Sequence, residues 1–274
     1  MSILVSQRWT RAPQVPVALR PEVARDAVVF VVPSAWRIFD MVKRVPLVAS
    51  GGGDFDYAPE GLAFRNSGGA NEWWESTGET RSVSTTDFTI EMLIRMTAAP
   101  SLSHVFGIGA QLPSFGTNQD MRRVLCFGGA SSDDIYFWGG GIGDWDTGVR
   151  FRTDGSLQHI FFTATGGTIR LYRDGVQAAS TTTPALIAVA DPTYLAVGSR
   201  HAGGASSATF RLMKGSIRNR ALTAQEVAEL TLNPWLDFVP QQRLWLNAAA
   251  AAARPRLVDG KLVNYGLLVG GLAS

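Results

Sequence analysis

The aromatic side chains best suited to bind a ligand gather in residues 133–148, DDIYFWGGGIGDWDTG. Tyr136, Trp138 and Trp145 can each offer a flat apolar face to a ligand, while a polar tip makes hydrogen bonds. Pockets that recognise small molecules combine such faces with a few polar groups. The stretch therefore predicts a recognition site around these three residues.

The same stretch contains two carboxylates that can bind a cation. Asp144 and Asp146 lie two residues apart in a glycine-rich run, and carboxylate oxygens are ligands that Ca²⁺ prefers. The run is short and no downstream glutamate follows to bind Ca²⁺ through both oxygens. An interpretation without any ligand also fits, with Ile135–Trp138 as a core strand and Asp144–Gly148 as an ordinary turn. Ca²⁺ is therefore a candidate cofactor and no other is expected.

A second candidate surface is the pair Trp73 and Trp74. The pair can form a platform for a ligand, but packing at a sheet edge or contact with another subunit fits it equally well. The sequence leaves these three interpretations open.

The composition favours a turn-rich β protein. The 274 residues are 46% apolar, enough for a substantial core, and include 29 glycines and 13 prolines. The net charge of +2 and the dispersed lysines and arginines argue against nucleic acid as a partner. The longest apolar runs are much shorter than the ~20 residues that a membrane-spanning helix requires. Because Cys126 is the single cysteine and the N-terminus lacks a signal-peptide pattern, we expect a soluble protein made in a reducing cytoplasm.

Strands must position the candidate residues, and the clearest strands lie between residues 157 and 182. Leu157–Thr163 and Thr168–Arg173 are two expected strands, and the glycines between them can adopt positive φ. Asp174-Gly175 favours a two-residue type I′ turn, so a third strand should follow. Three successive strands form an antiparallel meander, which needs a second apolar layer to bury its inner face.

The most regular single strand is Asp87–Thr97. Apolar residues occupy alternate positions, which predicts one core face and one solvated face; the core residues are Phe88, Ile90, Met92, Ile94 and Met96. Shorter strands are expected at Gly61–Phe64, His104–Gly107, Val124–Phe127, Ile135–Trp138, Val149–Thr153, Thr193–Val197 and Phe210–Met213. Many short strands separated by glycine-rich turns predict an all-β sandwich.

One short helix is expected over residues 224–232. Thr223 and Glu226 have the spacing of a capping box, and Asn233-Pro234 ends the helix. The apolar residues Trp235 and Phe238 predict that the following segment docks on the sandwich.

We expect the chain to have three parts: an N-terminal arm with one strand (1–56), the sandwich (57–232), and a C-terminal docking segment and tail (233–274). The strand of the arm is Val28–Val32. Because one strand cannot satisfy its own backbone, it should pair with the main sheet or with a neighbouring subunit.

Four segments, in this order, resemble laminin-G-like domains of the concanavalin A-like lectin/glucanase superfamily: Phe88–Glu91, Thr168–Gly175, Leu195–Gly198 and Asn219–Glu226. The resemblance covers residues 57–232 and implies a jelly-roll sandwich of two curved sheets. It also implies a concave face and loops that often bind sugars, proteins or Ca²⁺. Gly215-Ser216 departs from the pattern, because a strand is expected at this position. The flanks Trp9–Gln14 and Asn233–Phe238 resemble the ends of laminin-G-like structural proteins of tailed bacteriophages and prophages.

The resemblance does not extend to catalysis. Glucanases of this superfamily carry Glu-x-Asp-x-Glu along one strand, a spacing suited to retaining hydrolysis. Here Glu72 and Glu75 have the wrong spacing and Glu91 is alone on its strand. The sequence contains no nucleophile elbow or phosphate-binding glycine motif, and its three histidines lie far apart, with His159 expected to make a hydrogen bond within a strand. We therefore predict that the protein is not an enzyme, and keep a glycoside hydrolase as the third alternative.

These features lead to the hypothesis of a non-enzymatic bacteriophage virion protein whose lectin-like domain, on the tail or baseplate, contacts a glycan of the host surface. The alternative is a capsid decoration or other architectural protein without a small ligand. Its arms would contact other virion proteins or further copies of itself, as a homo-oligomer. The apolar ends Ile3–Val5 and Leu267–Val269 are the expected contacts. The first hypothesis requires the region of Trp138 and Trp145 to be exposed, and the second requires the arms to be held by neighbours.

Overall fold

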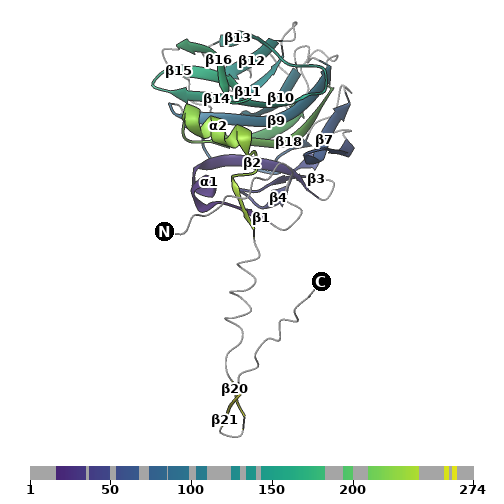
Figure 1. Cartoon of the computed structure of the whole chain (residues 1–274), viewed down its shortest axis with the longest axis vertical. Coiled ribbons are helices and arrows are strands. Elements are labelled where there is room, and N and C mark those ends of the chain that lie inside the picture. The colour runs from purple at the N-terminus through teal and green to yellow at the C-terminus, as the bar shows by residue number, and fades with distance from the viewer. Residues whose placement is uncertain are drawn as a thin grey trace.

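A computed structural model describes residues 17–34, 37–49, 54–67, 74–84, 86–98, 103–109, 125–129, 134–139, 143–182, 194–199, 209–240, 256–258 and 261–263. Two antiparallel sheets pack face to face, and short helices lie outside them (Figure 1). The predicted all-β sandwich is confirmed.

The larger sheet has ten strands. Its path runs through β16 (Val176–Thr182), β15 (Thr168–Arg173), β14 (Leu157–Thr165), β9 (Phe88–Ala98), β18 (Thr209–Arg218), β2 (Ala27–Ser34), β3 (Arg37–Asp40) and β4 (Val45–Pro46). Off this path, β7 (Gly61–Ser67) pairs with β18 and with β6 (Asp54–Ala58). The predicted meander is β14, β15 and β16, and the positive φ of Asp174 (53°) and Gly175 (83°) fits the expected turn.

The smaller sheet has seven strands. They run in the order β13 (Gly143–Arg150), β12 (Asp134–Gly139), β11 (Leu125–Gly129), β10 (Ser103–Gly109), β17 (Tyr194–Ser199), β8 (Trp74–Glu75) and β5 (Val48–Ala49). A separate hairpin consists of β20 (Arg256–Val258) and β21 (Lys261–Val263).

The main core lies between the two sheets. The five alternate apolar residues of β9 are all buried there, as predicted, together with residues of the seven-stranded sheet such as Phe106, Phe137 and Val197. The sheets approach closely at Gly215, where an added Cβ would lie 2.8 Å from Cε2 of Phe106. Gly215 belongs to β18, so the strand expected at Gly215-Ser216 is present and the glycine provides room for the opposite ring.

The other face of β9 was predicted to be solvated, and this prediction is wrong. Thr89, Glu91 and Leu93 are each fully buried. Helix α2 (Ala224–Leu232), the segment after it and the short N-terminal helix α1 (Pro21–Asp26) cover this outer face of the ten-stranded sheet (Figure 1). Period-two alternation identifies the more apolar face of a strand, but it does not show what covers the other face.

Helix α2 has the predicted bounds and the predicted capping box. Thr223 Oγ1 accepts a hydrogen bond from the Glu226 backbone N (3.2 Å), and the Thr223 backbone N donates to Glu226 Oε2 (2.8 Å). Its buried residues Val227 and Leu230 pack on the larger sheet. The six-residue helix α1 was not predicted, although it begins at Pro21 and proline is common in a first helical turn. Within the described residues, no helix is long and apolar enough to cross a membrane.

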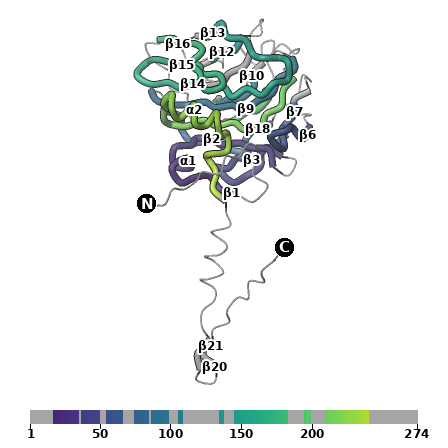
Figure 2. Tube along the Cα trace, in the orientation of Figure 1, coloured from purple at the N-terminus to yellow at the C-terminus, as the bar shows by residue number. Residues whose placement is uncertain are grey.

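The N-terminal boundary predicted at residue 57 falls inside the sandwich. Strand β2 pairs with β18 and β3, so the predicted pairing of Val28–Val32 with the main sheet is confirmed. After α2, Trp235 and Phe238 are buried, which confirms that this segment docks. Strand β19 (Phe238–Pro240) then pairs with β1 (Val17–Leu19), so the purple and yellow-green ends of the domain meet (Figure 2). The expected contact segments Ile3–Val5 and Leu267–Val269 lie outside the described residues.

Candidate functional site

The β12–β13 hairpin carries most of the candidate ligand-binding residues. In its ladder Tyr136 pairs with Asp146, and Phe137 pairs with Trp145. Phe137 is fully buried and its ring stacks on Phe88 with centroids 6.1 Å apart. Because side chains alternate between faces along a strand, the Phe137–Trp145 pair faces the core and the Tyr136–Asp146 pair faces away from it.

Trp145 therefore does not share a surface with Tyr136, contrary to the sequence-based prediction. Its half-buried ring packs edge-on against Phe162, with centroids 5.9 Å apart, and contacts the main core. The predicted turn at Asp144–Gly148 is also wrong, because Gly143–Arg150 is the edge strand β13. The sequence could not show this separation, because it depends on the register between two strands.

The Tyr136–Asp146 pair lies on the outer face of the seven-stranded sheet. Tyr136 is half-buried and Asp146 is exposed. On the other side of Tyr136, its partner in β11 is Gly128, so the neighbouring position carries no side chain. Trp138 pairs with Asp144 two residues along the ladder, but their side chains lie outside the described part of the structure. The outer face thus combines an aromatic ring and a carboxylate, next to a position without a side chain.

Of the two candidate Ca²⁺ ligands, the structure describes only the side chain of Asp146. Asp146 Oδ1 already accepts a hydrogen bond from the Gly148 backbone N (2.9 Å). Among the described residues, no three His, Cys, Asp or Glu side chains lie close enough to hold a metal ion. The role of Asp144 and Asp146 in Ca²⁺ binding stays a prediction.

Trp74 lies in the core, where it offers no open platform. It is 8% exposed, and its ring packs edge-on against Phe55 and Phe64 with centroids 5.4 Å and 6.4 Å away. This environment favours the packing interpretation of Trp74. Trp73 lies outside the described residues.

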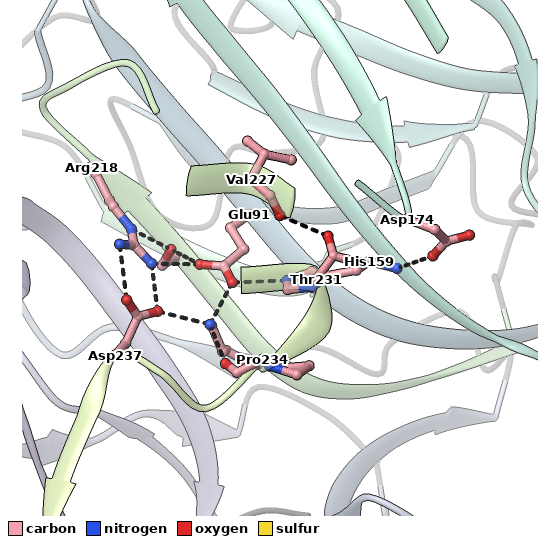
Figure 3. A network of polar contacts seen from close by, with 10 residues as sticks. Glu91, His159, Asp174, Arg218, Val227, Thr231, Pro234 and Asp237 are labelled. Carbon is pink, nitrogen blue, oxygen red and sulfur yellow. Dashed lines mark hydrogen bonds and ion pairs between the residues drawn. The ribbon is translucent and has the colours of Figure 1, made fainter. Parts of the chain in front are cut away.

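The sequence did not predict a cluster of charged side chains beneath the outer layer of the ten-stranded sheet. Glu91 of β9, His159 of β14, Lys214 and Arg218 of β18, and Asp237 after α2 are all buried (Figure 3). We call these five residues the ion cluster.

Glu91 is the centre of the ion cluster. Its Oε1 accepts a hydrogen bond from His159 Nε2 (2.9 Å) and forms an ion pair with Lys214 Nζ (2.5 Å). Its Oε2 accepts from Ser216 Oγ (2.8 Å) and Arg218 Nη2 (2.7 Å). Both carboxylate oxygens are thus engaged. The hydrogen bond expected of His159 is confirmed.

Asp237 is the second carboxylate of the ion cluster. Its Oδ2 accepts from Lys214 Nζ (2.8 Å) and Arg218 Nη2 (2.6 Å), and its Oδ1 accepts from Arg218 Nη1 (3.1 Å). Lys214 Nζ also donates to the Pro234 carbonyl (2.7 Å). Two carboxylates thus face two cations, so the charges of the buried ion cluster balance.

Burial alone raises the pKa of Glu91, but Lys214 and Arg218 outweigh it and hold that pKa well below the usual range. The same two cations lower the pKa of Asp237 against its burial. Burial lowers the pKa of His159, so the ring is neutral at pH 7 and its Nε2–H donates to Glu91. His159 Nδ1 is buried without a partner among the described groups.

The ion cluster is closed to a substrate, because each of its side chains is buried. A carboxylate that accepts three hydrogen bonds, pairs with Lys214 and has a depressed pKa is also unsuited to donate a proton. A sequence signal for the ion cluster did exist, because Lys214, Ser216 and Arg218 alternate along one strand. The strand was predicted only to Met213, so this polar row was missed.

The concanavalin A-like lectin/glucanases superfamily matches residues 68–228 of this chain. No significant match is found among curated protein sequences.

Several solved structures share the fold. The binding domain of Paraclostridial Mosquitocidal Protein 1 has a TM-score of 0.58 and 17% identity, over 76% of this chain and 52% of that chain. Domain 4 of AbnA, an extracellular arabinanase of Geobacillus stearothermophilus solved with arabinotriose, has a TM-score of 0.55 and 15% identity, over 75% and 98%. A structure of botulinum neurotoxin type C, whose cell entry depends on interaction with two ganglioside molecules, has a TM-score of 0.55 and 11% identity, over 77% and 51%. The chain thus covers about half of the length of the first and third structures. At these low sequence identities, the similarity shows a shared fold only.

Proposed function

We propose that this chain, which belongs to the concanavalin A-like lectin/glucanases superfamily, is a non-enzymatic protein that binds carbohydrate on the outer face of its seven-stranded sheet. The observation that carries the proposal is the pairing of Tyr136 with Asp146 on that face. An aromatic ring can stack on the apolar face of a sugar, and a carboxylate accepts hydrogen bonds from its hydroxyl groups. Gly128, which pairs with Tyr136, has no side chain that would lie between a sugar and the sheet.

The fold comparisons support a binding role. One similar structure is called a binding domain, and another was solved with arabinotriose. Ca²⁺ held by Asp144 and Asp146 remains part of the proposal as an optional cofactor. Its contribution is measured by repeating the binding assay with a chelator, which weakens binding only if the cation takes part.

Replacing Tyr136 by alanine is expected to weaken glycan binding about fivefold, because a stacked aromatic ring contributes on the order of 1 kcal/mol. Binding is measured first on a panel of immobilised neutral and acidic oligosaccharides and then by calorimetry with the best ligand. The matched control is Tyr57→Ala, which removes a tyrosine that is 72% exposed on the other sheet. If the Tyr136→Ala variant binds glycan as tightly as the parent protein, the glycan does not bind at Tyr136.

Trp145 provides a second comparison in this assay. The Trp145→Ala variant should lose about 2 kcal/mol of folding stability, since the ring is half-buried against Phe162. If the Trp145→Ala variant keeps normal stability but does not bind glycan, Trp145 belongs to the ligand site.

Purified protein is expected to release no reducing sugar from β-glucans or host-type polysaccharides. The buried and neutralised Glu91 supports this expectation, because glycoside hydrolysis needs a pair of accessible carboxyl groups. The assay measures reducing ends after prolonged incubation. Turnover that disappears in a Glu72→Gln variant would instead make the protein a hydrolase.

We further propose that the protein is a bacteriophage virion component, on the tail or baseplate. The support is the resemblance of Trp9–Gln14 and Asn233–Phe238 to the ends of phage structural proteins. One observation supports the architectural alternative: β1 and β19 are paired, so both terminal extensions start side by side. They can therefore contact the same neighbour, which is either another virion protein or a second copy of this chain. A map of the intact particle with this chain located distinguishes the two.

A further inference from the structure

We infer that the ion cluster is an acid-sensitive latch that holds residues 233–240, here called the strap, on the outer face of the ten-stranded sheet. The inference concerns a conformational change and does not depend on the ligand of the seven-stranded sheet.

The strap docks on the ten-stranded sheet through side chains. Trp235 and Phe238 bury their rings in an apolar cluster with residues such as Leu93 and Met213, and Phe238 meets Phe30 edge-on with centroids 5.3 Å apart. In the described part of the chain, β19 at the end of the strap pairs only with β1. Among the described residues, no ladder of backbone hydrogen bonds therefore ties the strap to the ten-stranded sheet. Its docking depends on its side chains and on the bond from Lys214 Nζ to the Pro234 carbonyl.

Asp237 is the only charged residue of the strap, and it completes the charge balance of the ion cluster. When the strap is docked, Asp237 and Glu91 face Lys214 and Arg218. Without Asp237, two cations would share one carboxylate beneath an apolar cover, an arrangement that is costly until water enters. Docking of the strap and ionisation of Asp237 therefore require each other.

The groups that face Glu91 come from every surrounding element. His159 lies on β14, and its backbone N donates to Asp174 Oδ1 (2.9 Å), a carboxylate that also pairs with Arg152. Lys214 and Arg218 lie on β18, and Asp237 lies on the strap. From α2, the nearby side chain of Thr231 is uncharged and donates to the Val227 carbonyl (Figure 3).

Acid should release the strap because three of these groups resist protonation while it is docked. The pKa values of His159, Glu91 and Asp237 are all lowered in the folded protein, from ordinary values of 6.5, 4.5 and 3.8. Undocking admits water and lets each pKa return toward its ordinary value, so the undocked state takes up protons first. Falling pH therefore favours the undocked state, first through His159 below about pH 6.5 and then through the carboxylates below about pH 4.5.

Release of the strap would also free the N-terminal segment. Val17 pairs with Pro240 and Leu19 with Phe238, so β1 loses its only described partner when β19 leaves. The latch thus controls β1 and the strap together.

Hydrogen exchange followed by mass spectrometry of the full chain tests the latch. Between about pH 7.5 and about pH 5, amides of 17–19 and 233–240 should exchange at least about tenfold faster after correction for the intrinsic rate. Amides of β9 and β14 should keep their protection. If the strap and β9 lose protection to the same extent at each pH, the whole domain unfolds and the inference is wrong.

Two variants separate the latch from a merely structural cluster. His159→Gln keeps an N–H donor for Glu91 without a titrating ring, so release should begin only below about pH 4.5. Asp237→Asn should raise exchange of the strap at least about tenfold already at neutral pH. The matched control is Asp54→Asn, which breaks an ion pair with Arg65 at an Asp side chain that is 71% exposed and should leave the strap unchanged. An unchanged pH profile in His159→Gln would contradict the inference even if Asp237→Asn does not fold.

Discussion

Replacing Glu91 by glutamine is expected to lower the free energy of unfolding by about 3–5 kcal/mol, the cost of breaking a buried ion pair on one side. Lys214 and Arg218 would then share only Asp237 in a buried site. A glutamine amide also presents an N–H₂ group to donors that now bond an oxygen. The loss should appear as a lower urea midpoint with an unchanged slope, followed by tryptophan fluorescence.

The matched control for this prediction is Glu60→Gln. Glu60 also accepts two hydrogen bonds from one arginine, Arg95, but this pair is partly exposed. Water can compensate Arg95, so the expected loss is about 1 kcal/mol. Equal losses in the two variants would show that burial adds nothing to the cost of breaking the ion cluster.

A fragment that comprises only residues 57–232 is expected not to fold. It lacks β2, whose residues 27–31 are each no more than 1% exposed, and it lacks the buried rings of Trp235 and Phe238. Six of these buried side chains are large, and each contributes about 1.5–3 kcal/mol. The summed loss of about 9–18 kcal/mol is as large as the roughly 5–15 kcal/mol that stabilises a typical domain. Far-UV circular dichroism and a thermal melt measure the outcome.

Residues 17–240 form the control fragment for this experiment. This fragment contains every described strand of the two sheets, both described helices and the ion cluster, so it should melt cooperatively. A cooperative melt of fragment 57–232 would show that the family-matched region folds without its flanks. The strap and β2 would then not be required for folding.

Features set by neighbouring residues were predictable from the sequence. The alternation in β9 identified its core residues, Thr223 and Glu226 identified the start of α2, and Asp174-Gly175 identified a hairpin turn. Each depends on contacts within a few residues of the chain, so the local pattern contains the necessary information. The superfamily match over residues 68–228 includes all of these segments.

The composition of the candidate surface depended on strand register. The sequence could place Tyr136 and Trp145 in one stretch, but only the ladder shows that Trp145 pairs with Phe137 and faces the core. A shift of one residue between β12 and β13 would exchange their faces. Since register follows from packing across the whole sheet, this separation required the tertiary structure.

The ion cluster depended most on tertiary structure. In the sequence Glu91 is a polar residue at an alternate position, which normally indicates solvent. In the fold, β14, β18 and the strap bring His159, two cations and Asp237 around it. The energy of a buried charge depends on all of its neighbours together, and these neighbours come from segments up to 146 residues apart, Glu91 to Asp237. The sequence by itself thus determined the central strands and helix α2, and the tertiary structure decided which charges they bury.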